Sequence, residues 1–246
     1  GNLFEMNQYN TDKLKKGLDE LEISHSDQQI EQLLTYYEMM IEKNKVMNLT
    51  SITEFDEAVE KHFLDSLSLV RVASLHSNWK ILDLGTGAGF PGIPLKIFFP
   101  ELNMTLMDSL NKRVLFLREV IETLGLKNIE ALHGRAEEMA RKKEFREQFD
   151  LCVSRAVANI ATLSEYCLPF VRLGGKFISY KSGQIGEEMQ NGKKAVFLLG
   201  GKITKIDQFH VPCTELDRCL VVIDKIKGTP KTYPRKAGTP SKDPLK

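Results

Sequence analysis

The chain has 246 residues, of which 42% are hydrophobic and 27% charged, and its formal net charge at pH 7 is +1. These values are typical of a soluble globular protein and exclude a largely disordered chain, while the length allows one substantial α/β domain with an appendage. No apolar run is long enough to cross a bilayer, and the first residues lack the basic-then-apolar pattern of a secretory signal. We therefore expect a cytoplasmic protein that acts away from membranes.

The N-terminal part, residues 6–75, is expected to form a helical cap, whereas residues 1–5 look like a loose end. Ser26 is placed to cap a helix whose apolar residues recur at helical spacing from Ile30 to Ile41. A second stripe with the same spacing runs through residues 54–73. Because each stripe makes one apolar face, both helices should pack against a sheet.

A glycine-rich turn follows the first expected strand, residues 80–84. Asp83 lies inside the apolar run of this strand, and glycines follow at 85, 87 and 89. Glycine lets the backbone turn sharply and approach a ligand closely. Pro91 and Pro94 then open a helix, where a missing amide hydrogen costs little. The turn therefore predicts a cofactor site.

Two cofactors compete for this turn. Gly87 to Gly92 match the GxGxxG pattern of dinucleotide-binding turns, which is a weak signal by itself. The carboxylate of Asp83 would repel the phosphates of a dinucleotide, whereas it suits the sulfonium and ammonium groups of S-adenosylmethionine. Asp108, which ends the next expected strand, can accept hydrogen bonds from the ribose hydroxyls of either cofactor. The charge of Asp83 therefore favours S-adenosylmethionine.

Residues 76–227 are expected to form a mostly parallel sheet covered by helices, because short apolar runs alternate with amphipathic ones. Further strands are expected at 104–108, 129–132, 150–154 and 176–181, and helices at 113–123 and 163–171. Two β-rich stretches, 203–211 and 219–226, have no helix between them and predict an antiparallel hairpin at the sheet edge. This α/β layout is that of the Rossmann-like class I methyltransferases, here with an N-terminal helical cap.

The C-terminal tail, residues 228–246, is basic and contains several Pro and Gly residues. This composition disfavours a regular helix and predicts an extended arm. Such an arm could follow a phosphate backbone through Arg235 and Lys236, with Tyr233 stacked on a base. The alternative is a solvated, mobile end.

The four cysteines, Cys152, Cys167, Cys213 and Cys219, show neither CxxC pairing nor a His-rich partner pattern. Reduced and mostly buried thiols are therefore favoured over a metal site or disulfides. Cys152 lies within an expected strand and should point into the core.

Several motifs together give a specific resemblance. They are residues 83–95, 108–113 and 154–156, supported by residues 48–50, 62–66 and 233–240. On these residues nearly the whole chain resembles the glucose-inhibited division protein B family. The resemblance implies an S-adenosylmethionine-dependent enzyme that methylates N7 of a guanine in 16S ribosomal RNA, either as free RNA or in an assembling small subunit. We expect it to act as a monomer.

The same resemblance implies roles for individual residues. Gly85 and Phe90 would line the methionine and ribose end of the cofactor, and Ala136 and Glu137 would hold its adenine. Arg155 would lie beside the transferred methyl group.

The residues around Arg155 agree with transfer to a ring nitrogen. Guanine N7 carries an in-plane lone pair at neutral pH, so its methylation needs alignment but no general base. Accordingly, the fourth strand ends in Ser154-Arg155-Ala156 and lacks the Asn/Asp-Pro-Pro-aromatic motif of enzymes that methylate exocyclic amines. Arg155 could donate to guanine O6 or hold a phosphate, or could simply pair with a carboxylate such as Glu137. Lys181 ends the fifth strand at the same rim, where it could contact RNA or remain solvated.

Three other functions fit parts of this pattern. A methyltransferase of a small metabolite would use the helical cap as a lid, but it would not need a basic tail. An NAD-dependent oxidoreductase is disfavoured by Asp83 and by the final hairpin. An RNA-binding protein could retain the cofactor for stability alone. His62, Asp65 and Asn48 are expected to be structural residues of the cap.

Overall fold

The computed structural model describes residues 8–76 and 78–246, so the expected loose end at residues 1–5 lies outside the described residues. Seven strands form one sheet in the order β3-β2-β1-β4-β5-β7-β6. The strands are β1 (Lys80–Leu84), β2 (Asn103–Asp108), β3 (Ile129–His133), β4 (Phe149–Ser154), β5 (Val171–Lys181), β6 (Gly201–His210) and β7 (Asp217–Lys225). The first five are parallel, and β7 runs antiparallel to both β5 and β6. The predicted strands and the hairpin are therefore confirmed.

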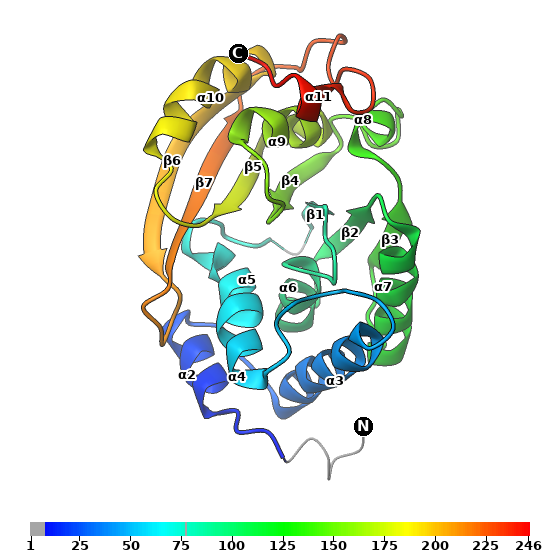
Figure 1. The fold of residues 1–246 in the computed structure, drawn as a ribbon, viewed down its shortest axis with the longest axis vertical. Helices are drawn as coiled ribbons and strands as arrows, with labels where there is room; N and C mark the ends of the chain where they lie inside the picture. The colour runs from blue at the N-terminus through cyan, green and yellow to red at the C-terminus, as the bar shows by residue number, and fades with distance from the viewer. Residues whose placement is uncertain (1–7, 77) are drawn as a thin grey trace.

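Helices cover both faces of this sheet (Figure 1). One layer holds α2 (Asp12–Glu20), α3 (Asp27–Asn44), α4 (Phe55–Ala58), α5 (Asp65–Leu67), α6 (Gly92–Phe98) and α7 (Asn111–Leu124). The other holds α8 (Ala136–Met139), α9 (Ile160–Cys167), α10 (Gly186–Leu198) and α11 (Thr239–Lys242). Two hydrophobic clusters correspond to the two faces, and the first joins the N-terminal helices to the sheet.

The capping prediction at Ser26 is confirmed. Its Oγ accepts a hydrogen bond from the backbone N of Gln29 at 3.1 Å, and the Gln29 side chain accepts one from the backbone N of Ser26 at 2.9 Å. These reciprocal bonds satisfy two amides at the start of α3 that have no partner within the helix. The helix that follows packs against α6 and α7.

Two predicted helices differ from the structure. Residues 54–73 form α4, a π-helical turn from Val59 to Leu64, α5 and a 3-10 turn. The predicted helix 163–171 begins earlier, at Ile160, and the chain enters β5 at Val171. A Cβ on Gly175 would lie 2.6 Å from the backbone O of Asp150, so this glycine allows β5 to run close to the start of β4. β5 therefore continues through Gly175, just beyond residue 171, where the predicted helix was expected to end.

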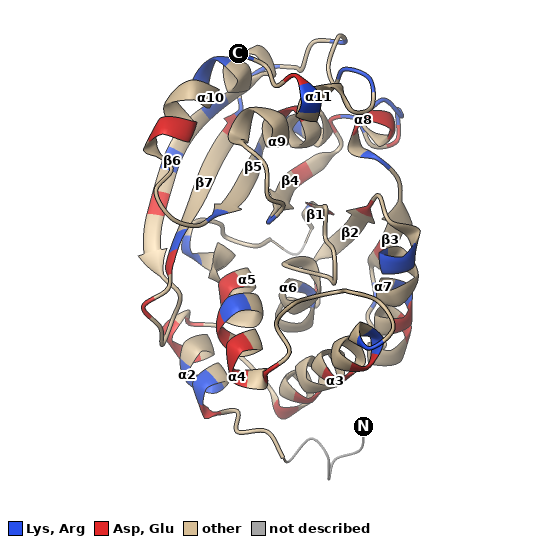
Figure 2. Ribbon diagram, viewed as in Figure 1, with Lys and Arg blue, Asp and Glu red and all other residues tan. Residues whose placement is uncertain are grey.

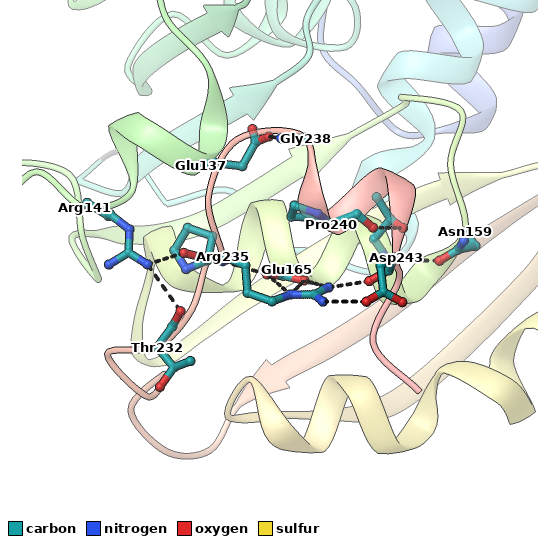
Figure 3. A network of polar contacts seen from close by, with 11 residues as sticks. Glu137, Arg141, Asn159, Glu165, Thr232, Arg235, Gly238, Pro240 and Asp243 are labelled. Atoms are coloured by element: carbon teal, nitrogen blue, oxygen red, sulfur yellow. Dashed lines mark hydrogen bonds and ion pairs between the residues drawn. The ribbon is translucent and has the colours of Figure 1, made fainter.

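The tail is also different from the predicted extended arm. It folds back over α8 and α9 and ends in the short helix α11 (Figures 1 and 3). Arg146 donates to the carbonyls of Tyr233 and Thr229 at 2.9 and 3.1 Å, and Thr162 Oγ1 donates to the carbonyl of Pro240 at 3.0 Å. Side chains from the domain satisfy tail carbonyls, which holds an irregular segment in one conformation.

Candidate active site

The glycine-rich turn lies between β1 and α6 and has the predicted geometry. The φ angles of Gly85, Gly87 and Gly89 are 70°, 60° and 114°, a region that side chains with a Cβ rarely adopt. A Cβ on Gly89 would also lie 2.6 Å from the Tyr36 hydroxyl oxygen. Tyr36 comes from α3, so the cap packs directly on the turn.

Asp83 holds this turn through hydrogen bonds from the protein interior. Its side chain is fully buried, and its Oδ2 accepts hydrogen bonds from Thr86 Oγ1 at 2.7 Å and from the backbone N of Gly92 at 2.8 Å. Burial raises the pKa of the carboxyl to about 7, although both hydrogen bonds oppose this shift. Asp83 lines neither of the two cavities at this end of the sheet. Asp83 therefore positions the turn, and its electrostatic role toward the cofactor stays a prediction.

The first cavity, which we call the β2 cavity, measures about 210 Å³ and lies between the ends of β1 and β2 and helices α8 and α9. It brings together four predicted cofactor residues, Gly85, Asp108, Ala136 and Glu137. Leu84, Met107, Leu163 and Tyr166 add largely apolar walls. A mostly apolar lining that also contains acidic groups fits an adenosine.

Two buried carboxylates mark the ends of the β2 cavity. Asp108 accepts hydrogen bonds from the backbone N of Gly87 and of Leu110, each at 2.9 Å. A carboxylate offers about four acceptor positions, so Asp108 can still accept from ribose hydroxyls. Glu137 accepts a hydrogen bond from the backbone N of Gly238 in the tail at 2.8 Å (Figure 3). The tail therefore fixes one wall of this cavity.

Phe90 lies beneath the helical cap and does not line the β2 cavity. Its ring stacks on that of His62, with centroids 4.2 Å apart and planes 8° from parallel. The guanidinium carbon of Arg155 lies 5.4 Å from the centre of the Phe90 ring. Phe90 thus connects the glycine-rich turn to the cap and to Arg155.

The second cavity, which we call the β5 cavity, measures about 520 Å³ and is lined by both Arg155 and Lys181. Ala156 lines the β2 and β5 cavities alike, so the two meet where β4 ends. Val157 exposes its whole side chain beside this junction. The two cavities are therefore neighbours, with Ala156 in the lining of both.

Arg155 is held by the cap. Its Nη1 lies 3.1 Å from Ser66 Oγ and 3.4 Å from Asp65 Oδ2, and its Nη2 lies 3.3 Å from His62 Nδ1. The carboxylate partner is thus Asp65 and not Glu137, the partner that the alternative interpretation named. Three neighbours fix the plane of the guanidinium at the edge of the β5 cavity.

Asp65 is a site residue that the sequence pattern assigned only to bracing the cap. Its side chain is 5% exposed and pairs with Arg155 and, at 3.2 Å from Oδ1, with Nε of Arg218. Burial raises the pKa of this carboxyl, and the two guanidiniums oppose the shift. Arg218 begins β7 and also lines the β5 cavity, but no motif in the sequence marks it.

Lys181, Arg235 and Tyr233 are engaged within the domain and do not project freely toward RNA. Lys181 donates to the carbonyl of Ala158 and pairs with Glu188 Oε2 at 2.8 Å. Arg235 forms an ion pair with Glu165, in which Arg235 Nη2 lies 2.8 Å from Glu165 Oε1. Tyr233 is partly buried and packs against the hydrophobic cluster that includes residues of α9. Lys236 is exposed and forms no ion pair among the described residues.

The cysteines agree with the prediction of buried thiols: Cys152, Cys167 and Cys219 are buried and Cys213 is half-buried, and all four are free. Within residues 8–76 and 78–246 no group of His, Cys, Asp and Glu side chains is arranged to hold a metal. No helix in the same ranges combines the length and apolar character that a bilayer crossing requires.

The burial of His62 gives a pH-dependent prediction. Burial lowers its pKa to about 3, and the nearby Arg155 adds to this shift, whereas an unfolded histidine titrates near 6.5. The unfolded chain therefore takes up the proton first, and the stability due to neutral His62 is lost as the pH falls from about 6.5 toward 3. Over this range the free energy of unfolding of the wild type should fall relative to that of His62→Gln, by at most about 1.4 kcal/mol per pH unit.

Urea unfolding at several pH values measures this difference. His76→Gln is the matched control, because His76 is exposed and forms no ion pair or hydrogen bond through its side chain among the described residues. A constant difference between the wild type and His62→Gln would contradict the prediction.

The parallel sheet with its antiparallel β7, the glycine-rich turn after β1 and the acidic end of β2 define a class I, S-adenosylmethionine-dependent methyltransferase. The family model of GidB, described as rRNA small subunit methyltransferase G, matches residues 29–217. The chain belongs to this family. The oxidoreductase alternative is therefore wrong.

Curated relatives agree over nearly the full length. The chain is 55% identical over 230 residues to the Ribosomal RNA small subunit methyltransferase G of Lachnoclostridium phytofermentans, covering 94% of this chain and 95% of that protein. It is 52% identical over 233 residues to the protein of the same name from Alkaliphilus metalliredigens, covering 95% and 98%.

Solved structures of lower identity share the fold. NSun6 from Pyrococcus horikoshii matches with a TM-score of 0.54 at 17% identity, over 73% of this chain and 57% of that chain. TrmN from Thermus thermophilus matches with a TM-score of 0.52 at 15% identity, over 68% and 53%.

Proposed function

We propose that the protein transfers a methyl group from S-adenosylmethionine to N7 of a guanine in 16S small-subunit ribosomal RNA. The observation that carries this proposal is the meeting of the β2 and β5 cavities at Ala156. The relatives' name, ribosomal RNA small subunit methyltransferase, supports RNA of the small subunit as the substrate. A ribosomal substrate supports action in the cytoplasm, and action as a monomer is part of the same proposal.

In this proposal the residues bind and align, and none removes a proton. S-adenosylmethionine supplies an electrophilic methyl group when it is bound in the β2 cavity, where Asp108, Ala136 and Glu137 would hold its ribose and adenine. Guanine N7 supplies its own lone pair, so the chain needs only to place it in line and to exclude water. Positioning of this kind can contribute up to about 7 to 11 kcal/mol to lowering a barrier.

Arg155 is the proposed catalytic residue. Its guanidinium, fixed by Asp65, Ser66 and His62, is placed to donate a hydrogen bond to guanine O6, which lies next to N7. Donation to O6 leaves the N7 lone pair free for the methyl group. The stacked His62 and Phe90 rings support Arg155 from the side of the cap.

RNA outside the reacting base would contact the basic surface near the tail. Figure 2 shows Lys and Arg on α11 and on the loops beside α8. Lys236 is exposed in this region and is the tail residue proposed to meet a phosphate. Tyr233 and Arg235 would support this contact by holding the tail in place, since both make contacts within the domain.

The test is methyl transfer with labelled S-adenosylmethionine to free 16S RNA, to small subunits and to large-subunit RNA, each from cells that lack the protein. After digestion to nucleosides we expect label in N7-methylguanosine from the small-subunit samples only. Label in another nucleoside would refute the chemistry. Binding of small-subunit RNA without any label would favour the RNA-binding alternative, and transfer only to small molecules would favour the metabolite alternative.

A further inference from the structure

The β5 cavity contains two carboxylates, and they differ in how many cations pair with them among the described residues. Asp65 is held between the guanidiniums of Arg155 and Arg218. Glu188, in the first turn of α10, has one cationic partner among the described residues, Lys181, which pairs with its Oε2. No described residue donates a hydrogen bond to Glu188 Oε1, and the Glu188 side chain is 29% exposed. The second carboxylate is therefore available to a ligand.

Glu188 is also held in place. Lys181 is only 10% exposed, donates a hydrogen bond to the carbonyl of Ala158 and forms an ion pair with Glu188. These contacts join the end of β5, the loop after β4 and the start of α10 around one carboxylate. A charged acceptor held in this way selects for a donor, because an acceptor on the ligand would meet it with repulsion.

Glu188 lines the β5 cavity but not the β2 cavity. Ala156 marks the junction of these two cavities, and Glu188 also lines a third cavity with Asn159 and Leu245. In guanine, N7 and the 2-amino group lie at opposite ends of the base. A guanine bound with N7 toward the β2 cavity would turn its N1–H and 2-amino donors into the β5 cavity, where Glu188 can accept from them.

We propose that Glu188 is the specificity-determining residue that reads the acceptor guanine by accepting hydrogen bonds from its N1–H and 2-amino groups. This inference rests on the proposed function, because it assumes that a guanine enters the β5 cavity with N7 toward the cofactor. Adenine would be rejected, since its N1 is an acceptor and it has no 2-amino group. Lys181 acts through Glu188 as a positioning residue.

The test compares GMP with IMP, which differs from GMP only in lacking the 2-amino group. Each is titrated into the protein saturated with S-adenosylhomocysteine, and binding is followed by ligand-observed NMR. A hydrogen bond to a charged group contributes about 1.5 to 3 kcal/mol, so the wild type should prefer GMP by roughly 10-fold or more. Glu188→Gln should reduce this preference to within about 2-fold, because it replaces one acceptor by a donor.

Glu187→Gln is the matched control, since Glu187 is the neighbouring, exposed carboxylate of α10 and lines none of these cavities. It should retain the wild-type preference for GMP. Glu188→Asp keeps the charge on a shorter side chain and should retain part of the preference for GMP. If Glu188→Gln does not fold, the preference of Glu188→Asp tests the role of Glu188 instead. Affinity for S-adenosylhomocysteine should be the same in all variants.

Three results would overturn the inference: no measurable binding of GMP to the wild type, equal binding of GMP and IMP, or an undiminished preference in Glu188→Gln. Formation of N7-methylguanosine in small-subunit RNA by the wild type is measured in parallel. If that product forms while Glu188→Gln keeps its preference, the reading role of Glu188 fails and the proposed function stands. If that product does not form, the proposed function itself fails.

Discussion

Replacement of Arg155 by lysine should lower kcat/KM for methylation of small-subunit RNA by about 100-fold, the cost of a reacting group misplaced by about 1 Å. The charge is kept, so the pair with Asp65 can persist. What is lost is the planar group that contacts Ser66, Asp65 and His62 together. Lysine ends in a single ammonium on a flexible stem and cannot hold the same orientation toward guanine O6.

The measurement is initial-rate kinetics over a range of RNA concentrations, with affinity for S-adenosylhomocysteine measured on the same samples. Arg172→Lys is the control, because Arg172, at the start of β5, pairs with Asp150 of β4, has a 48% exposed side chain and lines neither cavity. That variant should keep kcat/KM. An Arg155→Lys enzyme with unchanged kcat/KM would remove Arg155 from the catalytic role. Weaker S-adenosylhomocysteine binding with unchanged kcat would reassign it to the cofactor.

The sheet could be predicted because its strands are short apolar runs, and such runs indicate burial wherever they occur in the chain. The edge hairpin followed from the lack of a helix between residues 211 and 219. Local patterns were less informative where an apolar stretch changes structure, as at Val171. There the close approach of Gly175 to the backbone of Asp150 decides for a strand. That approach is a tertiary contact and leaves no periodic signal.

The candidate site likewise contains residues that local sequence patterns predict and residues that only tertiary contacts bring together. Gly85, Asp108, Ala136 and Glu137 lie together because they follow the ends of neighbouring parallel strands. The pairing of Asp65 with Arg218 joins the cap to the last strand and has no local motif. Asp83 shows a different limit: its position in an apolar run was evident, but the sequence argument considered only its charge toward the cofactor. Its burial under Thr86 and Gly92 is a property of the folded turn.

The tail offers two neighbouring basic residues with opposite expected effects. Arg235→Met should lower the free energy of unfolding by about 3 kcal/mol, because it removes the cationic partner of Glu165, whose side chain is 0% exposed. This loss of unfolding free energy lies at the lower end of the range for a buried ion pair that loses one partner, because the backbone N of residue 235 still donates to Glu165 Oε2. Lys236→Ala should change stability by less than about 0.5 kcal/mol, as expected for an exposed side chain.

Urea unfolding and RNA binding at several salt concentrations separate the two roles. Lys236→Ala should weaken RNA binding and reduce the salt dependence by about one phosphate contact, with S-adenosylhomocysteine affinity unchanged. The double variant Glu165→Gln, Arg235→Met removes the buried charge along with its partner and should recover part of the lost stability. Equal stabilities of the wild type and Arg235→Met would show that Glu165 does not need its partner. Unchanged RNA affinity in Lys236→Ala would remove Lys236 from the RNA contact, and Arg235 cannot take its place because Glu165 already engages it.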